Sequence, residues 1–154
     1  MTIGIAEALG LSSVRIEDLR LFAKYHDIGI IAIKDEILFK SGPLNYEEME
    51  QMRNHSVIGY RIAQAIPDLF AVADWILKHH ERWDGQGYPL RLKGQEIPLE
   101  CRILAIADAY DAMINDRPYR KAMSHQQAMA ELHNASGEQF EPSLLELFED
   151  HIGR

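Results

Sequence analysis

Apolar residues recur at helical spacing along almost the whole chain, with no sustained apolar–polar alternation bounded by hairpin turns. This pattern favours an all-α bundle over any fold built on a sheet. Six or seven helices are expected, over residues 1–9, 13–27, 45–65, 67–80, 98–115, 124–135 and 142–151, with a short helical turn near 34–38. Residues 82–97 contain three glycines and Pro89, which predicts a long loop of the kind that carries function on a rigid scaffold.

Local signals mark where several of these helices begin. Asn45 with Glu48, and Ser124 with Gln127, have the spacing of capping boxes. The helix that Asn45 opens is expected to run without interruption to about Ala65.

Composition narrows the class of protein. A chain of 154 residues fits one domain, residues 1–154, with a single hydrophobic core. Its net charge of −8 makes non-specific DNA binding a poor candidate, because such binding neutralises many phosphates. The single cysteine, Cys101, cannot form an internal disulfide, so a reducing, cytoplasmic setting is expected. No stretch is apolar enough to span a membrane, and the N-terminus lacks the basic region of a signal peptide.

Six polar residues are expected to point inward from apolar helix faces. One of them, Asp108, lies in the segment CRILAIADAYDAMI, which is apolar nearly all round, so its carboxylate is expected to be buried. A lone buried histidine is usually structural, but several histidines and carboxylates facing one another across a bundle are how such folds hold metal ions. The set is His26, Asp27, His55, His79, His80 and Asp108. The other histidines, His125, His133 and His151, are expected on the surface or at caps.

The types of ligand atom narrow the choice of metal. Imidazole and carboxylate ligands without thiolate argue against a structural zinc site, and suit iron, manganese, cobalt or nickel, with zinc as a further fit. Six ligands exceed what one catalytic ion with open positions needs, so two divalent ions bridged by a carboxylate such as Asp27 fit better. Two such ions are a common device for hydrolysing phosphate esters, through an activated hydroxide that attacks phosphorus.

These residues resemble a known family. His26-Asp27, His79-His80 and Asp108 follow the order of the HD-domain metal-dependent phosphohydrolases, and HHERWDGQGYP at 79–89 closely resembles the signature of the HD-GYP subfamily. Residues 102–124 and 137–148 resemble that subfamily as well. The resemblance implies an all-α HD-domain bundle that carries two or three metals, often iron or manganese, and hydrolyses the bacterial second messenger cyclic di-GMP.

The resemblance also implies roles for particular residues. The six residues of the set become metal ligands, with Asp27 also the catalytic bridging group. Tyr88 and Pro89 belong to the GYP loop at the mouth of the site. Arg117, Arg120 and Lys121 occupy a basic element that faces the ligand's phosphates. Their alternative interpretation is an ordinary solvated helix end.

The sequence departs from the family pattern in two places. The family usually has a further Glu and His on an upstream helix, and here only Glu7, Glu17 and Asp18 are acidic residues before His26. Of these, Glu17 and Asp18 are expected on an exposed helix face. We therefore expect the usual upstream helix to be missing. The family also has Lys three residues after the HD aspartate, where this chain has Ile30.

Three functions remain open. The first is a metal-dependent phosphodiesterase acting on cyclic di-GMP or a related cyclic dinucleotide. The second is an impaired module that binds a nucleotide, or a signalling-protein partner through the GYP loop, without turnover. Whether the chain is an oligomer is left open as well. The third is an HD hydrolase of other nucleotides, which the GYP loop and the basic element disfavour.

Overall fold

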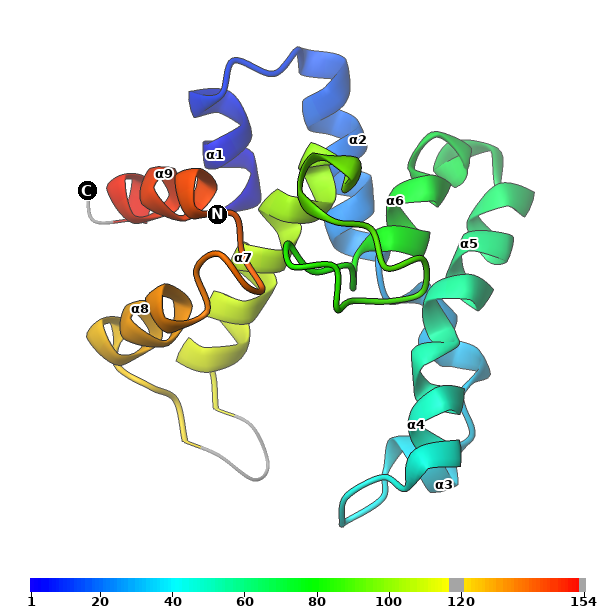
Figure 1. Ribbon diagram of the computed structural model, residues 1–154. Coiled ribbons are helices and arrows are strands. Elements are labelled where there is room, and N and C mark those ends of the chain that lie inside the picture. The colour runs from blue at the N-terminus through cyan, green and yellow to red at the C-terminus, as the bar shows by residue number, and fades with distance from the viewer. Residues whose placement is uncertain (117–120, 153–154) are drawn as a thin grey trace.

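The computed structural model describes residues 1–116 and 121–152, and in this part of the chain the fold is all-α (Figure 1). The only strand-like feature among them is an isolated bridge between Ser136 and Phe140. The expected fold class is therefore confirmed. The α-helices are α1 Thr2–Ala8, α2 Ser13–Tyr25, α3 Asp35–Leu38, α4 Tyr46–Arg53, α5 His55–Ala65, α6 Ala73–Lys78, α7 Leu99–Ile114, α8 His125–Asn134 and α9 Pro142–Ile152, with 3₁₀ helices η1 Ile28–Ala32, η2 Pro67–Val72 and η3 Gly94–Glu96.

Side-chain caps start several helices where the sequence predicts them. The capping boxes of Asn45 and Ser124 are both present at the starts of α4 and α8. Ser12 caps α2 by accepting a hydrogen bond from the backbone N–H of Arg15. These caps satisfy N–H groups that have no partner within the helix.

The helix expected over 45–65 is two helices, which corrects the sequence prediction. The break falls at Asn54, between α4 and α5. At this break, side chains bond to backbone carbonyls. The ring Nδ1 of His55 lies 2.6 Å from the carbonyl oxygen of Met52, and the Ser56 hydroxyl donates to the carbonyl oxygen of Arg53 at 3.1 Å. This side-chain bonding competes with the regular backbone ladder. The break leaves His55 as the first residue of α5, not a residue in the middle of a helix.

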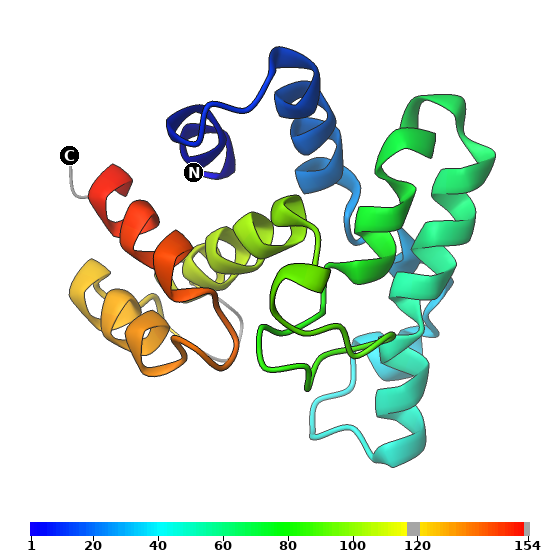
Figure 2. The same cartoon turned by 45° about the horizontal axis from the view of Figure 1, so that its top comes forward.

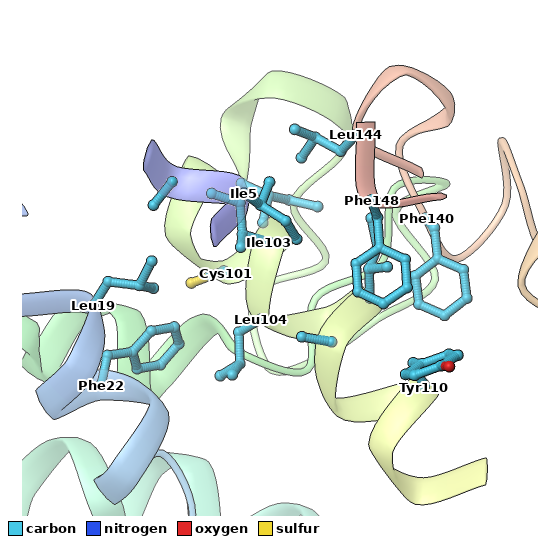
Figure 3. Packing of buried hydrophobic residues seen from close by; sticks show 14 of the residues in the cluster. Ile5, Leu19, Phe22, Cys101, Ile103, Leu104, Tyr110, Phe140, Leu144 and Phe148 are labelled. Atoms are coloured by element: carbon cyan, nitrogen blue, oxygen red, sulfur yellow. The ribbon is translucent and has the colours of Figure 1, made fainter. Parts of the chain in front are cut away.

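The long helix α7 lies at the centre of the hydrophobic core. In both views α1, α8 and α9 lie on one side of it, and α4 follows α5 on the other (Figures 1 and 2). Ile103 and Leu104 of α7 pack among side chains from α1, α2 and α9, including Ile5, Phe22 and Phe148 (Figure 3). This core fixes the ends of α2 and α6 relative to α7, and these are the elements that carry the polar set.

The loop after α6 folds back on its own beginning. The backbone N–H groups of Trp83 and Asp84 donate to the carbonyls of Gln139 and Glu138, and Gly94 N–H donates to the carbonyl of Trp83. The loop is thus fastened to the segment before α9. None of the helices in the described residues is long and apolar enough to cross a membrane.

Candidate metal centre

Four of the six polar residues come together in one cluster. One ligand atom from each of Asp27, His55, His79 and His80 lies within 4.8 Å of the others. Asp27 Oδ1 is 3.4 Å from Nε2 of both His55 and His79. The cluster joins the end of α2, the start of α5 and the end of α6. It is compatible with binding of a divalent metal.

Three histidines of the centre are oriented in the same way by helix ends. His26 and His79 follow the last residues of α2 and α6, and His55 follows the end of α4 by two residues. In each, ring Nδ1 lies 2.6 to 3.0 Å from the carbonyl three residues earlier. Carbonyls in the last turn of a helix have no N–H partner within it. An Nδ1–H that donates to such a carbonyl leaves Nε2 unprotonated and free to bind a metal.

The contacts between the rings fit a cation at the centre. Nε2 of His55 lies 3.3 Å from Nε2 of His79 and 3.1 Å from Nε2 of His80. With Nδ1 of His55 and His79 donating to carbonyls, the Nε2 lone pairs of the two rings face each other. A positive ion among the three nitrogens removes that repulsion. The chemistry of these ligand atoms, imidazole nitrogens beside a carboxylate, therefore fits a divalent metal.

The charges of the centre act on one another. Burial opposes ionisation of Asp27, but the contacts of its carboxylate with His26, His55 and His79 outweigh that effect and hold the pKa of this carboxyl well below its usual range. Burial also lowers the pKa of His26, but Asp27 outweighs that effect and the net pKa is raised. Burial, together with His79 and His55, lowers the pKa of His80 to about 3. The aspartate is thus ionised and His80 is a neutral donor.

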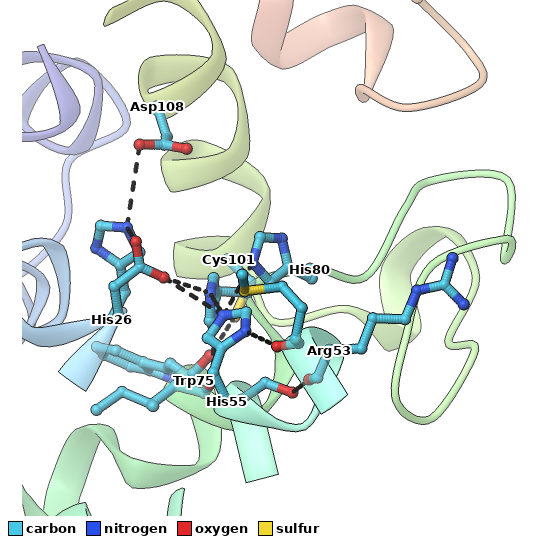
Figure 4. A network of polar contacts seen from close by, with 12 residues as sticks. His26, Arg53, His55, Trp75, His80, Cys101 and Asp108 are labelled. Carbon is cyan, nitrogen blue, oxygen red and sulfur yellow. Dashed lines mark hydrogen bonds and ion pairs between the residues drawn. The ribbon is translucent and has the colours of Figure 1, made fainter. Parts of the chain in front are cut away.

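The remaining two predicted ligands lie on the other side of Asp27. His26 Nε2 is 3.4 Å from Asp27 Oδ2, the oxygen that does not face His55 and His79. Asp108 Oδ1 is 4.0 Å from the same His26 nitrogen (Figure 4). The two carboxylate oxygens of Asp27 therefore face different groups of donors.

The prediction that Asp108 is buried is wrong. Its side chain is 57% exposed, and it lines a pocket of about 200 Å³ together with His26 and His80. One turn before Asp108 on α7 lie Leu104 and Ala105, and Ala109 follows it; all three also line the pocket, and Leu104 is itself buried. Alanine counts as apolar in composition, but its side chain is too short to cover a carboxylate.

Two glycines allow the segment after Asp27 to approach α5 at backbone distance. A Cβ on Gly29 would lie 1.9 Å from the carbonyl oxygen of His55 and 2.6 Å from the backbone nitrogen of Gly59. A Cβ on Gly59 would in turn lie 3.3 Å from the nitrogen of Gly29. This contact between η1 and α5 places Asp27 beside His55.

The GYP loop covers His80. The ring of Tyr88 stacks on the ring of His80, with centroids 4.9 Å apart and planes 25° apart. The guanidinium of Arg53 also lies over the Tyr88 ring, 5.3 Å from its centroid. Burial raises the pKa of Tyr88 to about 12, so its phenol stays neutral. Pro89 follows through a cis peptide bond and lines a second, larger pocket with Tyr88.

Glu81 and Arg82 belong to the recognised signature, but sequence reasoning gave them no role. The buried Glu81 carboxylate accepts the backbone N–H groups of Leu90 and Leu92, at 2.7 and 2.9 Å, and so anchors the loop. Arg82 is held by Asp84 through Nε and Nη2, and it lines the same pocket as His26 and Asp108. Their position directly after His79-His80 is the sequence feature that could have indicated a role at the site. Arg53, two residues before His55, had no signal in the sequence.

The described residues include only part of the predicted basic element. Arg117 and Arg120 lie outside the described residues, and Lys121 is exposed. Ile30 lies in η1 and is partly buried. Among the acidic residues before His26, Glu7 is exposed, as is Glu17, which pairs with Arg20. Asp18 is half-buried, so the prediction of an exposed face holds for Glu17 and not for Asp18. His125, His133 and His151 are exposed, as expected.

Comparison with known proteins identifies related chains. The sequence pattern of the HD-domain family, described as "HD domain", matches residues 2–144. A cyclic di-GMP phosphodiesterase of Thermotoga maritima is 44% identical over 146 residues, which are 94% of this chain and 40% of that protein. A 3'3'-cGAMP-specific phosphodiesterase 2 of Vibrio cholerae is 39% identical, over 96% of this chain and 28% of that protein. The chain thus spans less than half the length of these relatives, and the sequence resemblance to HD-GYP proteins is confirmed.

A solved structure shows the same fold. The crystal structure of a cyclic GMP-AMP-specific phosphodiesterase of Vibrio cholerae superposes with a TM-score of 0.77, over 99% of this chain and 42% of that one. Sequence identity between the two is 23%, so this likeness supports the arrangement of helices alone.

Proposed function

This chain belongs to the HD-domain family, and from that premise we propose that it is a metal-dependent phosphodiesterase that hydrolyses cyclic di-GMP or a related cyclic dinucleotide. The observation that carries the proposal is the cluster of Asp27 with His55, His79 and His80, whose ligand atoms lie within 4.8 Å of one another. The relatives that cover more than nine tenths of this chain are phosphodiesterases of such nucleotides.

Two divalent ions, iron or manganese in the first place, are proposed to occupy the centre. His55, His79 and His80 would serve one ion, and His26 and Asp108 the other. Asp27 would bridge them, which is supported by its Oδ1 facing His55 and His79 while Oδ2 faces His26. When bound, a pair of such ions activates water for attack on phosphorus and neutralises phosphate charge.

The protein's own residues orient the substrate around that centre. Arg82, with Nε and Nη2 held by Asp84, lines the pocket beside His26 and His80. A guanidinium in this position suits a phosphate oxygen. Lys121, with Arg117 and Arg120, is proposed to hold the second phosphate. Tyr88 stacks on His80 at the edge of the donor set, between the centre and the larger pocket.

The test is reconstitution without oxygen. Protein loaded with Mn²⁺ or Fe²⁺ is mixed with cyclic di-GMP and the linear products are separated by chromatography, while each metal is quantified per chain. About two ions per chain and product formation are expected. Protein that holds two ions and forms no product from cyclic di-GMP or 3'3'-cGAMP contradicts the proposal.

A second candidate is a module that binds the nucleotide without turnover. It is favoured by Ile30, which is partly buried and apolar where the resemblance leads one to expect a lysine beside the phosphate. Ile30→Lys separates the two candidates. Hydrolysis that appears only in this variant supports the binding module, and hydrolysis by the unchanged protein excludes it.

A further inference from the structure

The larger pocket of the molecule lies beyond the Tyr88–His80 stack. It measures about 810 Å³ and is formed between α4, the start of α5 and the loop at 85–91. Its volume is in the range of sites for small organic ligands. Tyr88 lines this pocket and stacks on His80, which lines the smaller pocket of the metal centre. The two pockets are therefore neighbours separated by one pair of rings.

The lining of the larger pocket favours an anionic ligand. Two arginines, Arg53 and Arg91, face one acidic residue, Glu50, and the other lining residues are neutral. The chain as a whole has a net charge of −8, so this positive balance is local. A ligand with phosphates and polar ring edges suits such a lining better than an apolar one.

Arg53 is held in place before any ligand arrives. Its Nη1 donates to Glu50 Oε1 at 3.1 Å, and its guanidinium lies over the Tyr88 ring. Figure 4 shows the Arg53 side chain extending away from His55 and the other rings of the centre, toward the loop. The pair thus presents guanidinium donors directly beside a carboxylate acceptor. Tyr46, also in the lining, is 80% exposed and offers a free aromatic face.

Guanine is the base whose edges match this arrangement. Its N1–H and N2–H groups donate side by side to a carboxylate, and its O6 and N7 accept from arginine, whereas adenine has no hydrogen on N1 and no amino group at C2. An exposed tyrosine ring can stack on either base. The arrangement therefore discriminates between purines through Glu50 and Arg53, and not through stacking.

We propose that this pocket is a guanine-recognition subsite, in which Glu50 and Arg53 read one base of a cyclic dinucleotide whose phosphate lies at the metal centre. The inference rests on the proposed function, since it needs a dinucleotide bound at that centre. The Arg53 guanidinium lies 5.3 Å from the Tyr88 ring centroid, and that centroid lies 4.9 Å from the His80 ring centroid. These two distances set the gap between the subsite and the centre. A ribose between phosphate and base covers a gap of this size. Gln86 and Arg91 lie at the loop side of the same pocket.

The experiment compares base preference between matched variants. Dissociation constants are measured by calorimetry for phosphorothioate analogues of cyclic di-GMP, 3'3'-cGAMP and cyclic di-AMP. The variants are Glu50→Gln and, as the control on the same helix, Glu47→Gln, whose exposed side chain does not line the pocket. The unchanged protein and the control are expected to prefer cyclic di-GMP to cyclic di-AMP by about tenfold or more. Glu50→Gln is expected to bring that ratio close to one.

The ratio separates this inference from the proposed function. An unchanged ratio in Glu50→Gln, or an equal loss of affinity for all three nucleotides, overturns the subsite while hydrolysis by the unchanged protein still supports the phosphodiesterase. Unchanged protein that binds no cyclic dinucleotide overturns the subsite as well. In that case, cleavage of bis(p-nitrophenyl) phosphate by the metal-loaded protein shows that the substrate assignment failed and the hydrolytic chemistry did not.

Discussion

Replacing Gly29 with alanine should separate Asp27 from His55. The new Cβ would lie 1.9 Å from the His55 carbonyl oxygen, whereas real Cβ atoms essentially never come closer than 3.0 Å, so η1 and α5 must move apart by about 1 Å. Overpacking of this kind costs about 1–3 kcal/mol, which corresponds to a fall in Tm of roughly 2–12 °C for a chain of this size. Ligands of a metal site tolerate displacements of only about 0.5 Å. We therefore expect the Mn²⁺ affinity to fall by about tenfold or more.

A graded series of glycine variants checks that reasoning. Gly59→Ala meets the Cγ2 methyl of the buried Ile76 at 2.9 Å, a much smaller overlap than the one at Gly29, so its effect should be smaller. Gly42→Ala has nothing within 4 Å and serves as the control. The measurements are thermal unfolding by circular dichroism and Mn²⁺ binding by calorimetry. A folded Gly29→Ala protein with the Mn²⁺ affinity of the Gly42→Ala control would refute the argument from close approach.

Three further predictions concern the centre and its loop. Asp27→Ala should empty both proposed ion sites, which elemental analysis measures, and full metal content in that variant refutes the bridging role. Glu81→Gln leaves one carbonyl oxygen for the two N–H groups of Leu90 and Leu92, so we expect a loss of about 1–3 kcal/mol in denaturant unfolding. In metal-free protein, His80 takes up a proton near pH 6.5 when unfolded but only near pH 3 when folded. The unfolded state thus binds more protons in that window, and stability should fall as pH drops from about 6.5 toward 3, with a flatter Tm profile in His80→Gln.

The sequence predicted those parts of the fold that depend on local chemistry. Caps at Asn45 and Ser124 and the helical spacing between them are determined by neighbouring residues, and the structure has them where expected. The break at Asn54 was not predictable in the same way, because apolar spacing continues through it. It depends on the His55 ring and the Ser56 hydroxyl bonding to carbonyls of the preceding turn.

The sequence likewise predicted one part of the candidate centre and missed another. His26, Asp27, His55, His79 and His80 were identified from their types and positions, and the structure brings them together. The exposure of Asp108 was missed because it depends on the size of the neighbouring side chains, which a count of apolar residues ignores. The contact of Arg53 with Tyr88 joins residues 35 positions apart, so only the folded chain reveals it.

The carbonyl bonds of His26, His55 and His79 have a consequence for the kinetics of metal uptake. Each ring is fixed by a carbonyl only three residues away, so its orientation is set as soon as the helix end forms. No distant partner has to arrive first. The metal-free centre should therefore need little reorganisation, and the rate of ion entry should follow the rate at which each ion exchanges its own water. Manganese, iron and nickel should then load at rates ordered by their hydration, whatever the order of their final affinities.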